Sequence, residues 1–128
     1  MIDMASIRSK NTRPELTVRR LIHALGYRFR LHRTDLPGSP DIVFPSRQKV
    51  IFVHGCFWHR HTCKWGCKVP PGKPDYWRAK FTRNVARDVR DREALKQAGW
   101  KYLIVWECEV KDIARLQRRL LRFLNAGK

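Results

Sequence analysis

The stretch "PDIVFPSRQKVIFVHG", residues 40–55, contains two apolar runs on either side of a short polar turn. Residues 42–44 and 50–53 are rich in β-branched side chains and are apolar at every position. Strands of this kind are typical of the centre of a sheet whose two faces are both covered. We therefore expect two central strands, with Asp41 at the start of the first and His54 at the end of the second.

Helical and extended patterns flank these two strands. Thr12 and Glu15 have the spacing of a capping box, and apolar residues at helical spacing then continue as far as Gly26. Segment 27–33 alternates apolar with basic residues, as a strand with one buried face does. Further along the chain we expect a loop over 64–74, a buried strand over 100–108 and a closing helix over 113–124. Between the loop and the strand, a helix is expected over 75–98, with Trp77, Phe81 and Val85 on one apolar stripe. A break in this helix near 82–84 is left open.

The order of these elements predicts an α/β fold. A helix, three strands, an irregular loop, a helix, a strand and a helix are best accommodated by a mixed sheet flanked by helices. The chain has 128 residues, which is enough for one core but too few for two ordinary domains. We expect a single domain spanning 1–128.

The charge of the chain indicates a polyanionic partner. Lys and Arg number 28 against 11 Asp and Glu, which gives a net charge of +17. Nucleic acid is favoured over a membrane surface and over a basic surface without a ligand, because no stretch pairs a broad aromatic face with lysines. No apolar run reaches the roughly 18 residues that span a bilayer, and no secretory signal is evident, so we expect a cytoplasmic protein.

A cluster of metal-binding side chains follows the second central strand. Cys56, His61 and Cys63 form the pattern C-x4-H-x-C, and a structural zinc ion takes four such ligands. We favour Cys108 as the fourth ligand because a remote ligand restricts a longer segment of the unfolded chain, while Cys67 is the local competitor. The alternative is that Cys108 is a small buried apolar residue and the histidines only decorate a basic loop.

Two adjacent aromatic residues, Phe57 and Trp58, lie between the first two of these candidate ligands. Neighbouring side chains on a metal-stiffened loop cannot both face one core. In a protein that binds a polyanion, this pattern predicts a wedge that inserts between base pairs and replaces the lost stacking. The alternative is that one ring packs onto the sheet as an anchor for the loop.

Several residues near these strands are suited to metal-assisted hydrolysis. A carboxylate at a strand end, such as Asp41, can hold Mg²⁺ beside a phosphodiester, although it can also bond the amides of its turn. If zinc takes His61, then His54 and His59 remain to activate or position water. Glu15 either caps its helix or reaches water at the metal.

The segments "LPGSPDIVF", "VIFVHGCFWHRHTC", "NVARDVRD" and "GWKYLIVWEC" closely resemble the very short patch repair endonucleases, the family of DNA mismatch endonucleases. The resemblance runs from about Ile7 to Cys108. It implies a restriction-endonuclease-like fold in a bacterial protein that acts as a monomer. It also implies that one strand of double-stranded DNA is nicked on the 5′ side of the thymine in a T:G mismatch, the product of 5-methylcytosine deamination. Other repair proteins are possible further partners.

The resemblance also implies the catalytic roles. Asp41 is the expected Mg²⁺ ligand, together with the main-chain carbonyl of Val53. His59 is the expected general base, oriented by Asp88. Restriction-type nucleases commonly carry Glu-x-Lys on the second catalytic strand, whereas this strand ends in Phe-Val-His, so histidine takes the role of the base.

By the same resemblance, Glu15 and His54 hold metal-bound water. Phe57 and Trp58 form the wedge beside the mismatch, and Met4 enters from the opposite groove. The expected zinc ligands are Cys56, His61, Cys63 and Cys108. Cys67 is left without a role.

Two other functions remain as alternatives. A non-catalytic, zinc-bearing module that recognises distorted duplex DNA predicts binding without nicking in any divalent metal. A strand-nicking nuclease of a mobile element predicts the same chemistry on a different target. Matched, T:G and single-stranded substrates distinguish the three.

Overall fold

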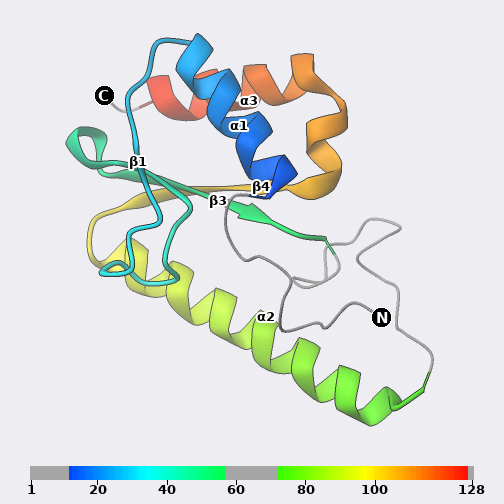
Figure 1. Ribbon diagram of the computed structural model, residues 1–128. Coiled ribbons are helices and arrows are strands. Elements are labelled where there is room, and N and C mark those ends of the chain that lie inside the picture. The colour runs from blue at the N-terminus through cyan, green and yellow to red at the C-terminus, as the bar shows by residue number, and fades with distance from the viewer. Residues whose placement is uncertain (1–11, 57–71, 127–128) are drawn as a thin grey trace.

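The protein folds into a four-stranded mixed sheet with helices on both of its faces (Figure 1). The computed structural model describes residues 12–56 and 72–126. The α/β class expected from the order of elements is confirmed. In chain order the elements are α1 (Arg13–Ala24), β1 (Arg30–Leu31), β2 (Ile42–Phe44), η2 (Pro45–Arg47), β3 (Lys49–His54), α2 (Pro74–Gln97), β4 (Lys101–Trp106), η3 (Glu107–Lys111) and α3 (Ile113–Asn125).

The strands are arranged in their sequence order, β1-β2-β3-β4. β1 pairs with β2, and β2 with β3, in antiparallel orientation, whereas β3 and β4 are parallel. The parallel pair requires a crossover, and α2 lies within it. The two apolar runs of the sequence, now β2 and β3, are the interior strands of the sheet, which confirms their predicted position.

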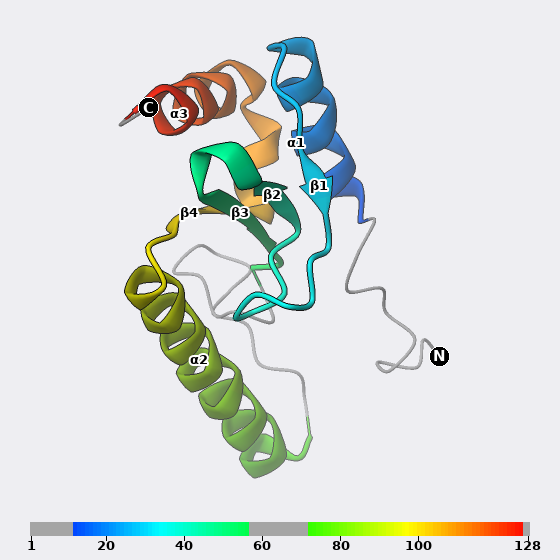
Figure 2. The same cartoon turned by 90° about the vertical axis from the view of Figure 1, so that its left-hand side faces the viewer.

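The two faces of the sheet have separate cores because successive strand residues point to opposite sides. On β3, Ile51 packs with buried side chains of α1 and α3, whereas Val50 and Phe52 pack with Leu95 of α2. Figures 1 and 2 show α1 and α3 covering one face and α2 covering the other. Both faces of the interior strands are therefore dry, as their uninterrupted apolar sequence predicted.

The strand expected over 27–33 is much shorter in the structure, where only Arg30–Leu31 forms β1. Tyr27 and Phe29 pack against the core beside α1 and α3, as the alternation predicted, but Leu31 is 38% exposed. The pattern stops at His32, whose φ of 51° lies in the left-handed region. A β-strand cannot continue through that conformation, so the backbone turns away from the sheet.

The long helix α2 runs from Pro74 to Gln97 without the break that the sequence left open. Its interior contains neither glycine nor proline, so nothing interrupts its hydrogen bonds. Phe81 is buried, but Val85 is 39% exposed, so the expected apolar stripe is only partly covered. Figure 1 shows the N-terminal part of α2 extending past the strands. Among residues 12–56 and 72–126, no helix is both long enough and apolar enough to cross a membrane.

A buried lysine joins the sheet to the end of α3. Lys49 is 1% exposed, and its Nζ donates hydrogen bonds to the carbonyl oxygens of Phe123 at 2.7 Å, Leu124 at 3.1 Å and Ala126. The last carbonyls of a helix have no partner within the helix and carry partial negative charge. The ammonium group therefore satisfies the C-terminal end of α3 and fixes it to β3.

We predict that Lys49→Met lowers the free energy of unfolding by about 2–4 kcal/mol, because it leaves buried carbonyl groups without a charged donor. Chemical denaturation of the two proteins measures the difference. Lys101→Met is the matched control, since Lys101 pairs with Lys49 in the β3·β4 register but is exposed. Equal effects of the two substitutions would contradict this role of Lys49.

Candidate active site at the end of the sheet

The carboxyl group of Asp41 is fixed across two strands. Asp41 directly precedes β2, and its Oδ2 accepts a hydrogen bond of 2.7 Å from the backbone amide of Val53 on β3. The sequence left open whether Asp41 bonds amides of its own turn, but the structure shows this bond to the neighbouring strand. The contact involves the amide of Val53, and its predicted use of the carbonyl as a metal ligand stays a prediction.

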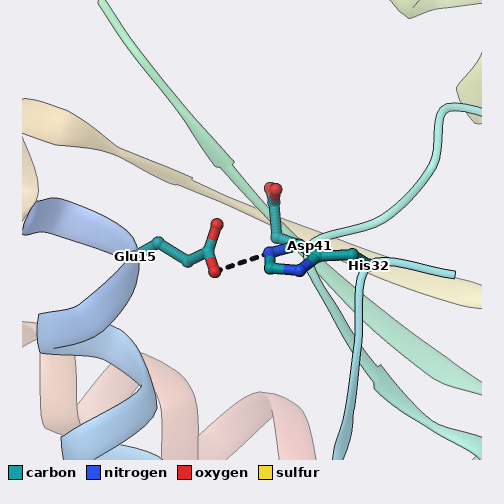
Figure 3. A group of neighbouring side chains, drawn as sticks. All are labelled: Glu15, His32 and Asp41. Atoms are coloured by element: carbon teal, nitrogen blue, oxygen red, sulfur yellow. Dashed lines mark hydrogen bonds and ion pairs between the residues drawn. The ribbon is translucent and has the colours of Figure 1, made fainter. Parts of the chain in front are cut away.

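Two more side chains approach Asp41 from other elements. Glu15, His32 and Asp41 each offer one ligand atom, and these three atoms lie within 4.8 Å of one another (Figure 3). Glu15 Oε2 lies 2.7 Å from His32 Nε2 and 2.9 Å from an Arg19 guanidinium nitrogen. Three separate segments therefore converge at one end of the sheet: α1, the residue after β1, and the residue before β2.

The structure assigns Glu15 to this cluster. Thr12 Oγ1 accepts a hydrogen bond of 3.4 Å from the Glu15 amide, so one half of the expected capping box is present. The Glu15 carboxylate, however, is 1% exposed and faces His32 and Arg19. Glu15 thus begins the helix through its backbone and contributes its side chain to the candidate site.

The environment of Asp41 disfavours a buried negative charge. Burial, the largest cause, and the neighbouring Glu15 carboxyl group together raise the pKa of the Asp41 carboxyl to about 7. The Val53 amide and Arg19 act in the opposite direction and lower this pKa. Two carboxylates that share one site repel each other, and a divalent cation between them removes that cost. The donor set therefore suits a hard cation such as Mg²⁺.

A cleft of about 640 Å³ opens beside this cluster, which is large enough to admit part of a ligand of nucleotide size. Its lining brings together four of the residues selected from the sequence: Asp41, Val53, His54 and Asp88. His32 also lines it, so the cleft and the Glu15–His32–Asp41 cluster share two residues. Three of the 11 acidic residues of the chain, Asp41, Asp88 and Asp91, line this cleft, together with Arg87 and Arg92.

The ends of β3 and β4 carry two of the four expected zinc ligands. The parallel register pairs His54 with Trp106, and Cys56 and Cys108 each follow two residues later. The amide of Cys56 donates a 3.4 Å hydrogen bond to the carboxylate of Glu107, the neighbour of Cys108. The sheet register therefore places the backbone of both cysteines just past the same end of the sheet. This arrangement is compatible with Cys108 as a remote ligand.

The other expected site residues lie outside the described part of the chain. They are Met4, Phe57, Trp58, His59, His61 and Cys63. Cys67, the local competitor for zinc, also lies there. Their roles stay predictions.

His32 was not selected from the sequence as a site residue. In the alternating segment 27–33 it shares the phase of Arg28 and Arg30, which are exposed, so the pattern assigns it to the solvent face. The left-handed backbone conformation of His32 overturns that assignment. The sequence has no turn residue at this position that would predict the end of the strand. The one feature of the sequence that could have indicated a role for His32 is its position, nine residues before Asp41 with a Pro-Gly turn between them.

Comparisons with known proteins point to one family. The model of the family "DNA mismatch endonuclease Vsr" matches residues 2–65. The type II nicking enzyme V.XorIIP of Xanthomonas oryzae is 56% identical over 122 residues, which cover 95% of this chain and 89% of the relative. The DNA mismatch endonuclease Vsr of Escherichia coli is 40% identical over 114 residues, covering 89% of this chain and 72% of the relative.

The chain belongs to the Vsr family. It is thus a strand-nicking DNA endonuclease of mismatch repair, and the predicted family resemblance is confirmed. Vsr nucleases are generally metal-dependent, and the Glu15–His32–Asp41 cluster is the candidate metal site among the described residues.

The raised pKa of Asp41 makes the stability of this Vsr protein depend on pH. Without metal, the raised pKa means that the folded chain binds a proton that the unfolded chain releases between about pH 4 and pH 7. Stability contributed by the protonated carboxyl is therefore lost as the pH rises through this range. Asp41→Asn keeps an acceptor for the Val53 amide but removes the charge.

We predict that, in buffer without added divalent metal, Asp41→Asn raises Tm by about 4 °C or more at pH 8 and has little effect at pH 4. Thermal melts of both proteins across this range measure the difference. A shift that is the same at every pH would argue against burial of an ionised Asp41.

Proposed function

We propose that this Vsr-family endonuclease nicks one strand of duplex DNA on the 5′ side of the thymine in a T:G mismatch left by 5-methylcytosine deamination. Magnesium is its proposed catalytic cofactor, and zinc its structural one. The observation that carries the proposal is the cluster of Glu15, His32 and Asp41, whose ligand atoms lie within 4.8 Å of one another at a cleft. We further propose that it acts on nucleoid DNA in the bacterial cytoplasm.

Asp41 is the proposed protein ligand of magnesium, with the Val53 carbonyl as a second. When bound, magnesium would stabilise negative charge on the oxygens of the scissile phosphodiester. The bond from the Val53 amide to Asp41 Oδ2 supports this role, because it fixes the carboxylate at the end of the sheet, beside the cleft. Glu15 lies beside Asp41 and is placed to hydrogen-bond water at the same site.

His59 is the proposed general base that takes a proton from the attacking water, and Asp88 is the residue proposed to orient it. The position of Asp88 in the same cleft as Asp41 supports this pairing. His54 also lines this cleft and is proposed to hold water there. A histidine base is appropriate because its neutral form is available near pH 7.

We propose that zinc binds Cys56, His61, Cys63 and Cys108. The thiols at the ends of β3 and β4 support this set, since the sheet register brings two remote ligands to one edge. Phe57 and Trp58, between two of the ligands, are proposed to insert beside the mismatch, with Met4 entering from the opposite groove.

The mixed sheet with helices on both faces agrees with a restriction-endonuclease-like fold, which we propose for residues 1–128 as one domain. We propose that the protein acts as a monomer. A basic chain with a net charge of +17 is suited to double-stranded DNA, and other repair proteins are possible partners.

We predict that the protein with Mg²⁺ nicks a 5′ end-labelled duplex containing one T:G pair, and that Asp41→Asn lowers the rate at least about 1000-fold because the metal site is lost. Denaturing gels measure the rate, and a gel-shift assay measures binding of the same duplex. The expected product ends at the base before the mismatched thymine. Asp35→Asn is the control, because Asp35 is an exposed carboxylate paired with Arg33.

The matched duplex and single-stranded DNA complete this test. Binding without nicking in every divalent metal would favour the non-catalytic DNA module. Nicking of matched and mismatched duplexes at equal rates would indicate a different target. Full activity of Asp41→Asn would overturn the proposed site.

We predict that the purified protein holds one zinc ion per chain and that Cys108→Ser loses it, whereas Cys67→Ser retains it. The reason is that Cys108 follows β4 at the edge where Cys56 follows β3. Metal analysis by mass spectrometry gives the stoichiometry, and thermal melts report the loss of stability. Zinc retained by Cys108→Ser and lost by Cys67→Ser would reverse the assignment.

A further inference from the structure

We infer that His32 is a third protein ligand of the catalytic cation, and that its ring nitrogen makes the site prefer Mn²⁺ to Mg²⁺ more strongly than carboxylates alone would. This inference rests on the proposed function, in which Asp41 holds the catalytic metal. It adds to that function a residue and a metal preference.

The spacing of the ligand atoms carries the first step. Two atoms that each bind one ion at about 2.1 Å are at most about 4.2 Å apart. The ligand atoms of Glu15, His32 and Asp41 lie within 4.8 Å of one another without any ion present. Side-chain movements of less than about 1 Å would therefore let His32 and Asp41 reach one ion, with Glu15 close enough to bond water on it.

The backbone holds His32 in this position. Its amide donates a 3.0 Å hydrogen bond to the carbonyl oxygen of Asp41, and its φ of 51° directs the chain away from the sheet. His32 and Asp41 are thus joined through the backbone, so their side chains occupy a fixed relative position. Figure 3 shows the imidazole joined to the Glu15 carboxylate by a hydrogen bond, with the Asp41 side chain beside it.

The surroundings of the ring favour a metal ligand over a solvent-exposed base. The His32 side chain is 21% exposed and lines the cleft, whereas Glu15, its hydrogen-bond partner, is 1% exposed. Arg19 balances one of the two carboxylate charges, and a bound cation would balance the other. A neutral imidazole adds a ligand without adding charge, with Nε2 on the ion and the ring proton on Nδ1.

The choice of metal follows from ligand chemistry. Mg²⁺ is a hard ion that prefers oxygen ligands and keeps several waters, and it gains little from nitrogen. Mn²⁺ accepts carboxylates equally well, and, as a first-row transition ion, it also binds imidazole. A site whose ligands are the Asp41 carboxylate, the Val53 carbonyl and one imidazole should therefore bind Mn²⁺ more tightly than Mg²⁺, and His32 should account for much of the difference.

The experiment compares the binding of each metal alone, without DNA, to the zinc-loaded full chain. Isothermal titration calorimetry measures the affinities for Mg²⁺ and Mn²⁺ of the natural protein, His32→Asn, Asp41→Asn and His23→Asn. Asparagine is chosen because it tolerates the left-handed backbone at residue 32. His23 is an exposed histidine of α1 and serves as the matched control. Thermal melts of the zinc-loaded proteins, without added Mg²⁺ or Mn²⁺, establish that every variant is folded.

We expect His32→Asn to reduce the affinity for Mn²⁺ about tenfold and the affinity for Mg²⁺ by less than about threefold, since only Mn²⁺ gains from the nitrogen. We expect His23→Asn to change neither affinity. Pulsed electron paramagnetic resonance of bound Mn²⁺ gives an independent result, because a coordinated imidazole nitrogen modulates the signal. That modulation should be present in the natural protein and absent in His32→Asn.

The outcomes separate this inference from the proposed function. Equal losses for the two metals, or nitrogen modulation unchanged in His32→Asn, would show that His32 only positions Glu15, and the inference would be wrong. Divalent binding that persists in Asp41→Asn, or is absent from the natural protein, would instead overturn the proposed metal site itself.

Discussion

The hydrogen bond between the Val53 amide and Asp41 Oδ2 is the contact on which the candidate site depends. It forms where β2 begins and β3 ends, so it can exist only if these two strands have their observed register. A slip of one residue would turn Asp41 to the other face of the sheet. The dry cores on both faces prevent that slip, because every residue of β2 is buried. The packing of the sheet thus determines the position of the carboxylate that we propose as the metal ligand.

The same packing creates an electrostatic conflict. In a chain of net charge +17, the buried Glu15 carboxylate lies close to the partly buried Asp41 carboxylate. Arg19 compensates only part of their charge, and the pKa of Asp41 rises to about 7. Such an arrangement lowers the stability of the metal-free protein, and a bound cation offsets the loss. This cost is typical of a functional site and has no structural benefit of its own.

The sequence predicted the parts of the fold that depend on periodicity. The uninterrupted apolar runs of β2 and β3 indicated an interior position, and the helical spacing before Gly26 indicated α1. The sequence was less informative about side-chain positions that depend on the backbone conformation of one residue. His32 was assigned to solvent because alternation assumes a continuing strand, and its left-handed φ breaks that assumption. Val85 was expected in a core because helical spacing does not reveal where a helix extends past its sheet.

The order of residues along β3 links catalysis to the proposed zinc site. Val53 anchors Asp41, His54 lines the cleft, and Cys56 follows within two residues. β4 runs parallel to β3 and ends at Trp106, so Cys108 lies just past the same end of the sheet as Cys56. An ion held between Cys56 and Cys108 would therefore tie together the ends of the two strands, and it would hold β3 at the point where it carries Val53 and His54. In such an arrangement, zinc would act on catalysis through the position of β3, even though it would take no part in the reaction.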